Sequence, residues 1–243
     1  MLRILDARTG ELIDAARAPR GLVRVHARVD RFDATGLRVL TCADVLVRAL
    51  ETGSNPVWAT LTSAVEAADA DELRRSAAGL GIRPFEEHHD ASTGPEATRT
   101  IEVLAADGTG TGAVRFEVAP VETDAGPVPA RRDPTDLRLA LLALRRDQPL
   151  RLDAAALAEA GTTLKRWRAA VAGWATRPSK PVPDDVRLRL RTAWEDDLDI
   201  PAVLDVLRWM ETSDVAEGAR FESYAYADRL LGLELTREIG SAS

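Results

Sequence analysis

LVRVHARV (residues 22–29) and PVWATLT (residues 56–62) are β-rich runs that enclose a helical pattern, LRVLTCADVLVRALE (residues 37–51). The two runs predict strands, and the apolar residues between them repeat at helical spacing until Thr-Gly ends the pattern. A strand, a helix and a strand at this spacing predict a right-handed βαβ unit with parallel strands. The first half of the chain is therefore expected to be an α/β domain.

Three further patterns complete the first half. AVRFEVAPV (residues 113–121) predicts a third strand, and residues 62–80 and 95–106 predict helices. The Gly-Thr-rich GTGTG (residues 108–112) looks like a phosphate loop, but a phosphate loop follows a strand and precedes a helix. Here the predicted order is reversed, so we interpret GTGTG as a turn into the third strand.

The Pro-rich GPVPARRDP (residues 126–134) marks a change to an all-helical pattern. Helices are predicted at residues 136–147, 153–175, 184–195, 200–212 and 218–231. Asp133, Asp153 and Asp199 stand at N-cap positions, and prolines 134, 183 and 201 stand near helix starts. We interpret the acidic cluster Asp196, Asp197 and Asp199 as helix capping rather than as a metal site. Two domains follow, residues 1–128 and 129–243.

Composition narrows the class of protein. The chain has 243 residues, 45% of them apolar and 29% charged, which is ordinary globular composition. A net charge of −7 argues weakly against a nucleic-acid partner. Cys42 is the only cysteine, so no intramolecular disulfide or cysteine-based zinc site can form. His26, His88 and His89 show no ligand spacing with it, and we expect no metal and no cofactor.

The remaining composition signals concern location and the core. No apolar run approaches the length of a membrane span and no secretory leader is visible, so the expected location is the cytoplasm. Cys42 is expected to be a buried, inert thiol. Trp167, Trp174, Trp194 and Trp209 lie in the helical half at helical spacing and are expected to be core or groove residues.

Several motifs together resemble class I cysteinyl-tRNA synthetases. DPTDLRLALLALRRDQPLRLDAAALAEAGTTLKRWRAAVAGW (residues 133–174) resembles the helical stem region of that family, with its DP-x-x-LR-x-x-LL helix. AWEDDLDIPAVLDVL (193–207) and FESYAYADRLLGLEL (221–235) resemble two later stretches in the same order. At the front, MLRILDARTGELIDAARAPRGLVRVHARV (1–29) and CADVLVRAL (42–50) resemble the entry into the first Rossmann strand and the following helix. The cysteine ligase of mycothiol biosynthesis shares these features.

The resemblance implies a Rossmann-like parallel sheet of the class I synthetase type, followed by an all-α stem-contact domain. The functional residues of that family have no equivalents at the matching positions of this chain. The H-x-G-H motif that binds ATP is replaced by DRFDATGLR (residues 30–38), and the zinc-binding cysteine at the end of the first strand is absent. The two later strands and the K-M-S-K-S loop also have no counterpart in the predicted elements. The resemblance therefore implies a reduced sheet without the nucleotide crevice.

These losses favour a catalytically degenerate paralogue, a pseudoenzyme that acts as a binding or regulatory module without aminoacylation. The alternative is an enzyme, a small ATP-dependent amino-acid or amide ligase of a specialised pathway. A third possibility is a structural subunit whose half-site is completed by another chain. Because the family's stem domain lies along tRNA, the resemblance implies RNA contact by the cations of that region: Arg145, Arg146, Arg151, Lys165, Arg166 and Arg168. The other possible partner is a protein, and no membrane is expected.

The predicted loss of strands leads to an expectation about the oligomeric state. If the two later strands are missing, residues 22–29 form a sheet edge with uncovered backbone groups. Val23, Val25 and Val29 alternate with Arg24, His26 and Arg28, which predicts one buried face and one polar face. Either the N-terminal LRILD or a second copy of the chain could cover that edge. We expect a homodimer.

Overall fold

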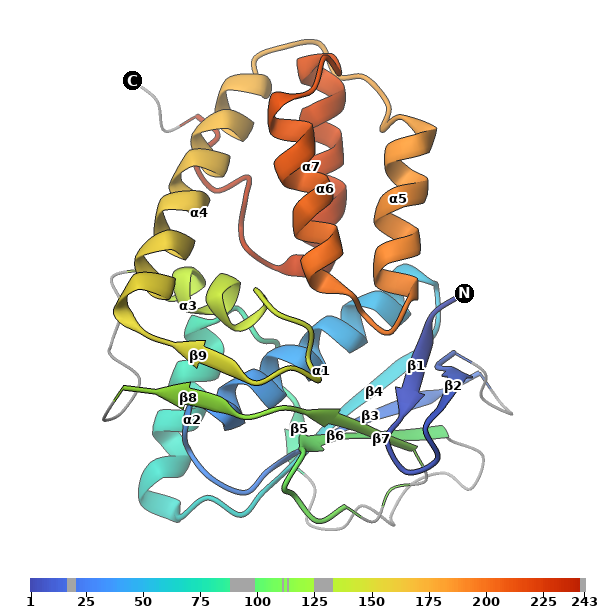
Figure 1. The fold of residues 1–243 in the computed structure, drawn as a ribbon, viewed down its shortest axis with the longest axis vertical. Helices are drawn as coiled ribbons and strands as arrows, with labels where there is room; N and C mark the ends of the chain where they lie inside the picture. Colours follow the sequence, from blue (N-terminus) through green and yellow to red (C-terminus); the bar gives the residue numbers. More distant parts are fainter. Residues whose placement is uncertain (17–20, 88–98, 111, 113, 125–132, 241–243) are drawn as a thin grey trace.

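The computed structural model describes the chain except residues 17–20, 88–98, 111, 113, 125–132 and 241–243. A sheet occupies the lower half of the molecule and a group of helices the upper half (Figure 1). The predicted class, a Rossmann-like α/β sheet followed by helices, is confirmed. No helix of the described part is long and apolar enough to cross a membrane.

The central sheet has five parallel strands in the order β5-β4-β3-β6-β7. These strands are β3 (Val23–Val29), β4 (Val57–Ser63), β5 (Glu86–Glu87), β6 (Arg99–Ala105) and β7 (Val114–Val118). Helix α1 (Ala34–Thr52) connects β3 to its parallel neighbour β4, so the predicted βαβ unit is confirmed. Along the chain, the sheet first grows on one side of β3 and then on the other.

The predicted helix at residues 95–106 is wrong where the structure describes it, because residues 99–105 form strand β6. Ile101, Glu102, Val103 and Leu104 are all buried, so this strand is buried on both faces and lacks the exposed positions that mark a half-exposed strand. Strand β6 pairs with β3 along Val23 to Ala27. The prediction that β3 forms a sheet edge is therefore also wrong, and the homodimer loses the reason given for it.

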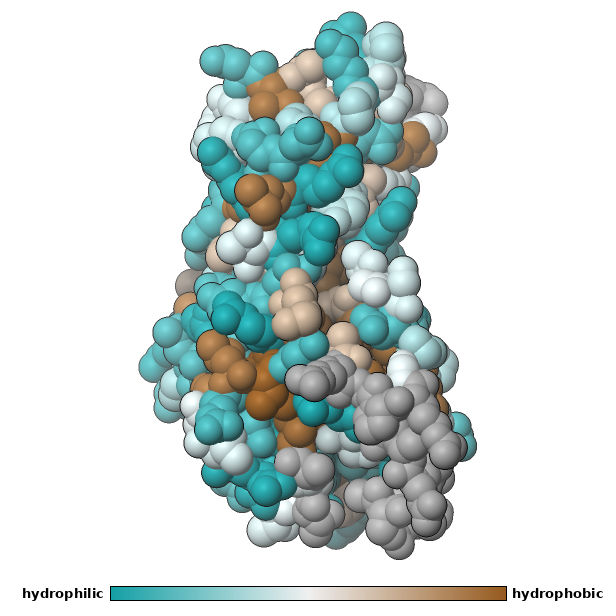
Figure 2. Space-filling model, turned by 90° about the vertical axis from the view of Figure 1, so that its right-hand side faces the viewer, coloured by the Kyte–Doolittle hydropathy of each residue, from teal (hydrophilic) through white to brown (hydrophobic). Residues whose placement is uncertain are grey.

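Two small sheets flank the central one. The N-terminal segment forms an antiparallel hairpin of β1 (Arg3–Asp6) and β2 (Glu11–Asp14), which lies against β7 through a hydrogen bond from Ala7 N to Arg115 O (2.9 Å). On the side of the molecule that carries this hairpin and α5 (Asp184–Glu195), apolar side chains gather in the lower half (Figure 2). Strands β8 (Val121–Thr123) and β9 (Leu150–Leu152) pair in parallel and link the two halves.

The predicted helices of the second half are present with small changes. They are α3 (Pro134–Leu141), α4 (Ala154–Trp174), α5, α6 (Ile200–Thr212) and α7 (Glu217–Leu231), and α2 (Ala67–Gly79) lies in the first half. Asp133, Asp153 and Asp199 each cap a helix, as predicted, by accepting a hydrogen bond from a first-turn amide. Helix α3 ends six residues before its predicted end at residue 147, and β9 interrupts the all-helical pattern.

Buried aromatic rings form the core of the helical half. Tyr224 makes edge-on contacts with Trp167 and Trp174, with ring centroids 5.8 and 5.1 Å apart. Trp194 is also buried, as predicted. Trp209 is 40% exposed and lies under the guanidinium of Arg189, so it belongs to the surface instead.

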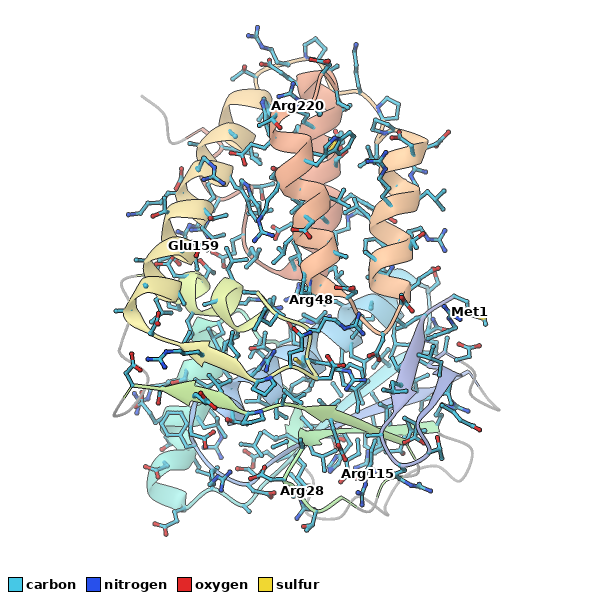
Figure 3. All side chains as sticks on the ribbon, in the orientation of Figure 1. Met1, Arg28, Arg48, Arg115, Glu159 and Arg220 are labelled. Atoms are coloured by element: carbon cyan, nitrogen blue, oxygen red, sulfur yellow. The ribbon has the colours of Figure 1, made fainter. Side chains whose placement is uncertain are left out.

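Buried arginines join the two halves. Arg38 on α1 donates hydrogen bonds to four backbone carbonyls in the segments next to β8 and β9, those of Ala119, Leu144, Arg145 and Gln148. Arg48, at the boundary between α1 and the helices above it (Figure 3), donates to Asp44 and to Gly81 O. One continuous apolar core runs through both halves. The structure thus packs the two predicted domains into one unit.

Candidate functional site at the switch point of the sheet

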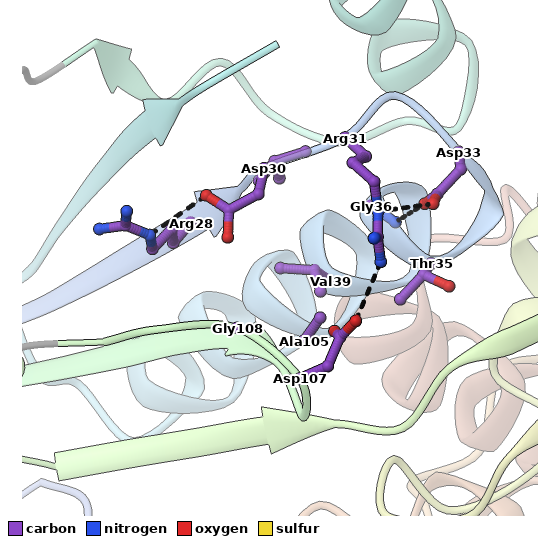
Figure 4. Close-up of a pocket in the computed structure, with 11 residues that line it drawn as sticks. Arg28, Asp30, Arg31, Asp33, Thr35, Gly36, Val39, Ala105, Asp107 and Gly108 are labelled. Carbon is purple, nitrogen blue, oxygen red and sulfur yellow. Dashed lines mark hydrogen bonds and ion pairs between the residues drawn. The ribbon is translucent and has the colours of Figure 1, made fainter.

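The central sheet has a switch point between β3 and β6. The chain leaves β3 toward α1 and β4 on one side, and β6 leads to β7 on the other. Open α/β sheets bind ligands outside the carboxyl ends of the strands at such a point. A cavity of about 110 Å³ lies there, lined by residues from the end of β3, the start of α1 and the end of β6 (Figure 4). We call it the switch-point crevice.

The crevice corrects one conclusion drawn from the sequence. The expected loss of half the sheet implied the loss of the crevice, but β6 and β7 supply the second side. Asp107 and Gly108, the first residue of GTGTG, line the cavity opposite residues 28–36. GTGTG leads into β7, as predicted.

One ion pair crosses the crevice and a second lies on its β3 side. Arg31 Nη2 lies 3.0 Å from Asp107 Oδ2, and Arg28 Nε lies 3.2 Å from Asp30 Oδ1 (Figure 4). The hydrogen bond and the charge of Asp107 raise the pKa of Arg31, with smaller contributions from Asp33 and Asp30. Arg31 is exposed, so the pair can be broken at little cost. The cations that could meet an anion here are already matched by carboxylates.

The N-terminus of α1 is also occupied by a side chain of the protein itself. Asp33 caps the helix, and its Oδ1 accepts a hydrogen bond from Gly36 N (2.8 Å). An anion at a helix N-terminus binds to free amides and to the positive end of the helix dipole. In this protein the carboxylate of Asp33 already occupies the place where such an anion would bind. Gly36 lies so close to the loop that a Cβ atom on it would be 2.5 Å from Arg31 O.

The chemistry available in the crevice follows from its residue types. Among the residues that the structure describes, its lining offers arginines, aspartates, one threonine and backbone groups, and no imidazole or lysine. The segment 30–38 that stands in place of the family's histidine motif forms the loop from β3 into α1. Such a crevice can hold a small polar molecule that exchanges with the ion pairs.

The six cations expected to contact RNA do not form one surface. Arg151, Lys165 and Arg166 are exposed, and Arg145 is half-buried. Arg146 and Arg168 are buried. Arg168 donates to Asp133, Thr135 and the carbonyls of Leu233 and Glu234, while Arg146 donates to Glu117 O and Asp197. The two buried arginines hold the fold together and cannot reach a partner.

The acidic cluster before α6 also has a structural role. Asp197 is buried in a left-handed backbone conformation (φ 55°) and accepts hydrogen bonds from Arg146 and Leu5 N. Arg145 binds Asp197 and Asp199. Among the described residues, no three metal-binding side chains lie close enough to hold an ion. The cap predicted at Asp199 is confirmed, and the anchoring role of Asp197 was missed.

A buried polar row on the sheet was also missed. Thr60, His26 and Glu102 lie side by side on β4, β3 and β6, and all three are fully buried. His26 Nδ1 lies 2.8 Å from Thr60 Oγ1, and Gly112 N donates to Glu102 Oε2 (2.6 Å). The alternation of polar residues in β3 was a correct signal of two different faces. His88 and His89 lie outside the described residues.

Cys42 has the environment that the sequence predicted. It is buried on α1, and burial raises the pKa of its thiol against the opposing effect of Arg38, Arg146 and Arg138. A thiol kept protonated is a poor nucleophile and metal ligand. Cys42 is therefore part of the packing between α1 and the helical half.

No protein-family model matches the chain. No curated protein matches it either.

Proposed function

We propose that the chain is a catalytically degenerate, cysteinyl-tRNA synthetase-like protein that acts as a binding or regulatory module without aminoacylation. Support for the ancestry comes from the ordered motifs at residues 133–174, 193–207 and 221–235, and from a Rossmann-like sheet followed by a helical half. The observation that carries the loss of activity is the carboxylate of Asp33, which caps α1 and accepts a hydrogen bond from Gly36 N (2.8 Å) where a phosphate would need free amides. Asp30 and Asp107 add two more carboxylates to the crevice, where a triphosphate would need cations.

Amino-acid activation tests this proposal. ATP–pyrophosphate exchange with each of the protein-building amino acids should give no signal above that of a protein-free blank. The physical reason is that adenylate formation needs groups that neutralise the phosphates, and the crevice pairs its arginines with aspartates. Clear exchange with even one amino acid would contradict the proposal.

One observation favours a second candidate function. The sheet has strands on both sides of the switch point and retains a crevice, as a small ATP-dependent amino-acid or amide ligase would require. The same exchange assay, repeated with amine acceptors present, distinguishes the two functions. The ligase requires ATP consumption that depends on an acid substrate.

RNA is the partner that the resemblance favours, and the exposed residues limit where it could bind. Lys165 and Arg166 are adjacent and exposed on α4, and Arg166 forms an ion pair with Glu211 (2.5 Å). Such charges on a helix are often only solvated, so any RNA contact should be weak and sensitive to salt.

A charge-reversal pair tests this contact. Lys165→Glu with Arg166→Glu should weaken a mobility shift of total tRNA. The matched control is Arg74→Glu with Arg75→Glu, which reverses two adjacent exposed cations on α2 that also have acidic neighbours. Equal shifts for both double variants would exclude α4 as the RNA surface.

A further inference from the structure

The switch-point crevice carries more negative than positive charge. Its described lining residues include three aspartates and two arginines, which leaves one carboxylate in excess. Arg28 pairs with Asp30 on the β3 side, and the other arginine, Arg31, lies between Asp33 and Asp107 (Figure 4). An anion would meet carboxylates on both sides of the crevice, whereas a cation would be attracted to them. The charge of the lining therefore favours a cationic ligand.

The side chain of Arg31 shows how a cation fits there. Its Nη2 lies 3.0 Å from Asp107 Oδ2, and its Nε lies 3.5 Å from Asp33 Oδ2. Asp33 follows β3 and Asp107 follows β6, so one guanidinium reaches carboxylates from both walls of the crevice. A planar guanidinium has N–H donors spread around its edge, whereas an ammonium group is a compact point charge. We call the two carboxylates, Asp33 and Asp107, the guanidinium site.

The guanidinium of Arg31 is bound only weakly at this site. The side chains of Arg31 and Asp107 are 67% and 68% exposed. An ion pair between side chains this exposed shifts an equilibrium by at most about fivefold. A free guanidinium can therefore displace Arg31, whose side chain then turns into solvent.

The walls and the size of the crevice favour an organic cation over a metal ion. Val29, Val39 and Ala105 line it with apolar surface, and a guanidinium is hydrated weakly enough to lie against such surface. The volume of about 110 Å³ is smaller than the roughly 150 Å³ of a cavity that holds benzene, so it suits a head group. In the part of the chain that the structure describes, three metal-binding side chains do not come together.

We propose that the switch-point crevice binds the guanidinium group of a ligand between Asp33 and Asp107, and that Arg31 is an internal competitor for the same place. The proposal rests on the proposed function, because it names the ligand class of a binding module. It adds a reason for the rejection of triphosphates, since the excess carboxylate that attracts a guanidinium repels a phosphate.

Methylguanidinium is the probe that tests this assignment, and Arg31→Ala is the variant that frees the guanidinium site. Chemical-shift titration of Arg31→Ala should show saturable changes at the amides of Asp33, Asp107 and Gly108. The parent protein should bind the probe up to about fivefold more weakly, because Arg31 competes for the same carboxylates. Methylurea has a similar shape without the charge and should not bind. Adding Asp107→Asn to Arg31→Ala should abolish saturable binding.

A second exposed arginine provides a closely matched control. Arg151 lies 2.6 Å from Asp124 and 3.5 Å from Asp153, the N-cap of α4, but it belongs to β9 rather than to the switch point. The exposures of Arg151 and Asp124, 66% and 61%, are close to those of the crevice pair. Arg151→Ala should show no saturable response to methylguanidinium around Asp124, because the carboxylates there lack the walls of the crevice.

Three results would each overturn the assignment: no saturable binding to Arg31→Ala, an equal response of Arg151→Ala around Asp124, or equal affinity for methylurea. ATP–pyrophosphate exchange tests the loss of aminoacylation separately, so the two proposals can fail independently. Acetyl-arginine-amide distinguishes the two sources of a guanidinium. Tighter binding than that of methylguanidinium assigns the site to an arginine side chain of a peptide, and equal or weaker binding assigns it to a free small molecule.

Discussion

Arg138 of α3 and Asp44 of α1 form an ion pair of 2.6 Å that is closed to solvent, with side-chain exposures of 0% and 1%. Arg138 also donates to Leu231 O and Leu80 O, so one guanidinium joins α1, α3 and the segments after α2 and α7. The pair thus ties the helical half to the sheet half. It acts together with the four hydrogen bonds of Arg38 and the shared apolar core.

Asp44→Asn should destabilise the protein by about 3–5 kcal/mol, because it leaves a buried guanidinium without its counter-charge. Urea unfolding followed by circular dichroism measures the change. The control is Asp71→Asn, which breaks the exposed pair with Arg74 and should cost at most about 1 kcal/mol. Similar losses for the two variants would mean that the Arg138–Asp44 pair does not hold the halves together.

The same pair predicts a dependence on pH. Burial alone would raise the pKa of Asp44, but the charges and hydrogen bonds of Arg138 and Arg48 lower it below the ordinary value. A lowered folded-state pKa means that the contribution of Asp44 is fully present above the unfolded-state pKa of about 3.9 and is lost as pH falls through the folded-state value. Unfolding free energies measured from pH 7 to pH 3 should decline more steeply at the acid end for the parent protein than for Asp44→Asn.

Gly36→Ala should destabilise the protein, although alanine is the better helix former. Its Cβ atom would lie 2.5 Å from the backbone oxygen of Arg31, so the loop at the crevice must move. The expected cost is about 1–3 kcal/mol. Gly173→Ala is the matched control, since nothing lies within 4 Å of its Cβ position, and it should stabilise α4 by about 0.5–1 kcal/mol. Thermal unfolding of both variants should show a lower melting temperature for Gly36→Ala and a higher one for Gly173→Ala.

Cys42 should resist thiol reagents in the folded protein. Burial raises the pKa of the thiol and blocks access, and both effects lower the concentration of reactive thiolate. Labelling with a chromogenic disulfide at pH 8 should be complete in denaturant and very slow without it. Fast labelling of the native protein would show that α1 separates easily from the helical half.

Local signals in the sequence were enough to predict the helices whose ends carry side-chain caps. Asp199 with Pro201 fixed the start of α6, and α5 and α6 have their predicted bounds. Strand β6 was not recognised, because a strand buried on both faces has the same apolar density as a helix. Without β6, β3 was expected to be an edge strand and the crevice was expected to be absent.

The crevice itself could be predicted only in part. The loop from Asp30 to Asp33 was recognised as the replacement of a nucleotide motif, but its partner Asp107 is 74 residues beyond Asp33 in the chain. The same holds for His26 and Glu102, which become neighbours through strand pairing. Contacts of this kind depend on sheet register, which no local pattern specifies.

The central claim is that the switch-point crevice no longer binds a nucleoside triphosphate. A calorimetric titration of the protein with magnesium-ATP tests it most directly, because binding is measured without assuming a second substrate. We expect no saturable heat up to millimolar ATP, because Asp33 caps the start of α1 and the carboxylates of Asp30 and Asp107 line the crevice. Saturable binding at micromolar ATP that is weakened by Arg31→Ala would contradict it.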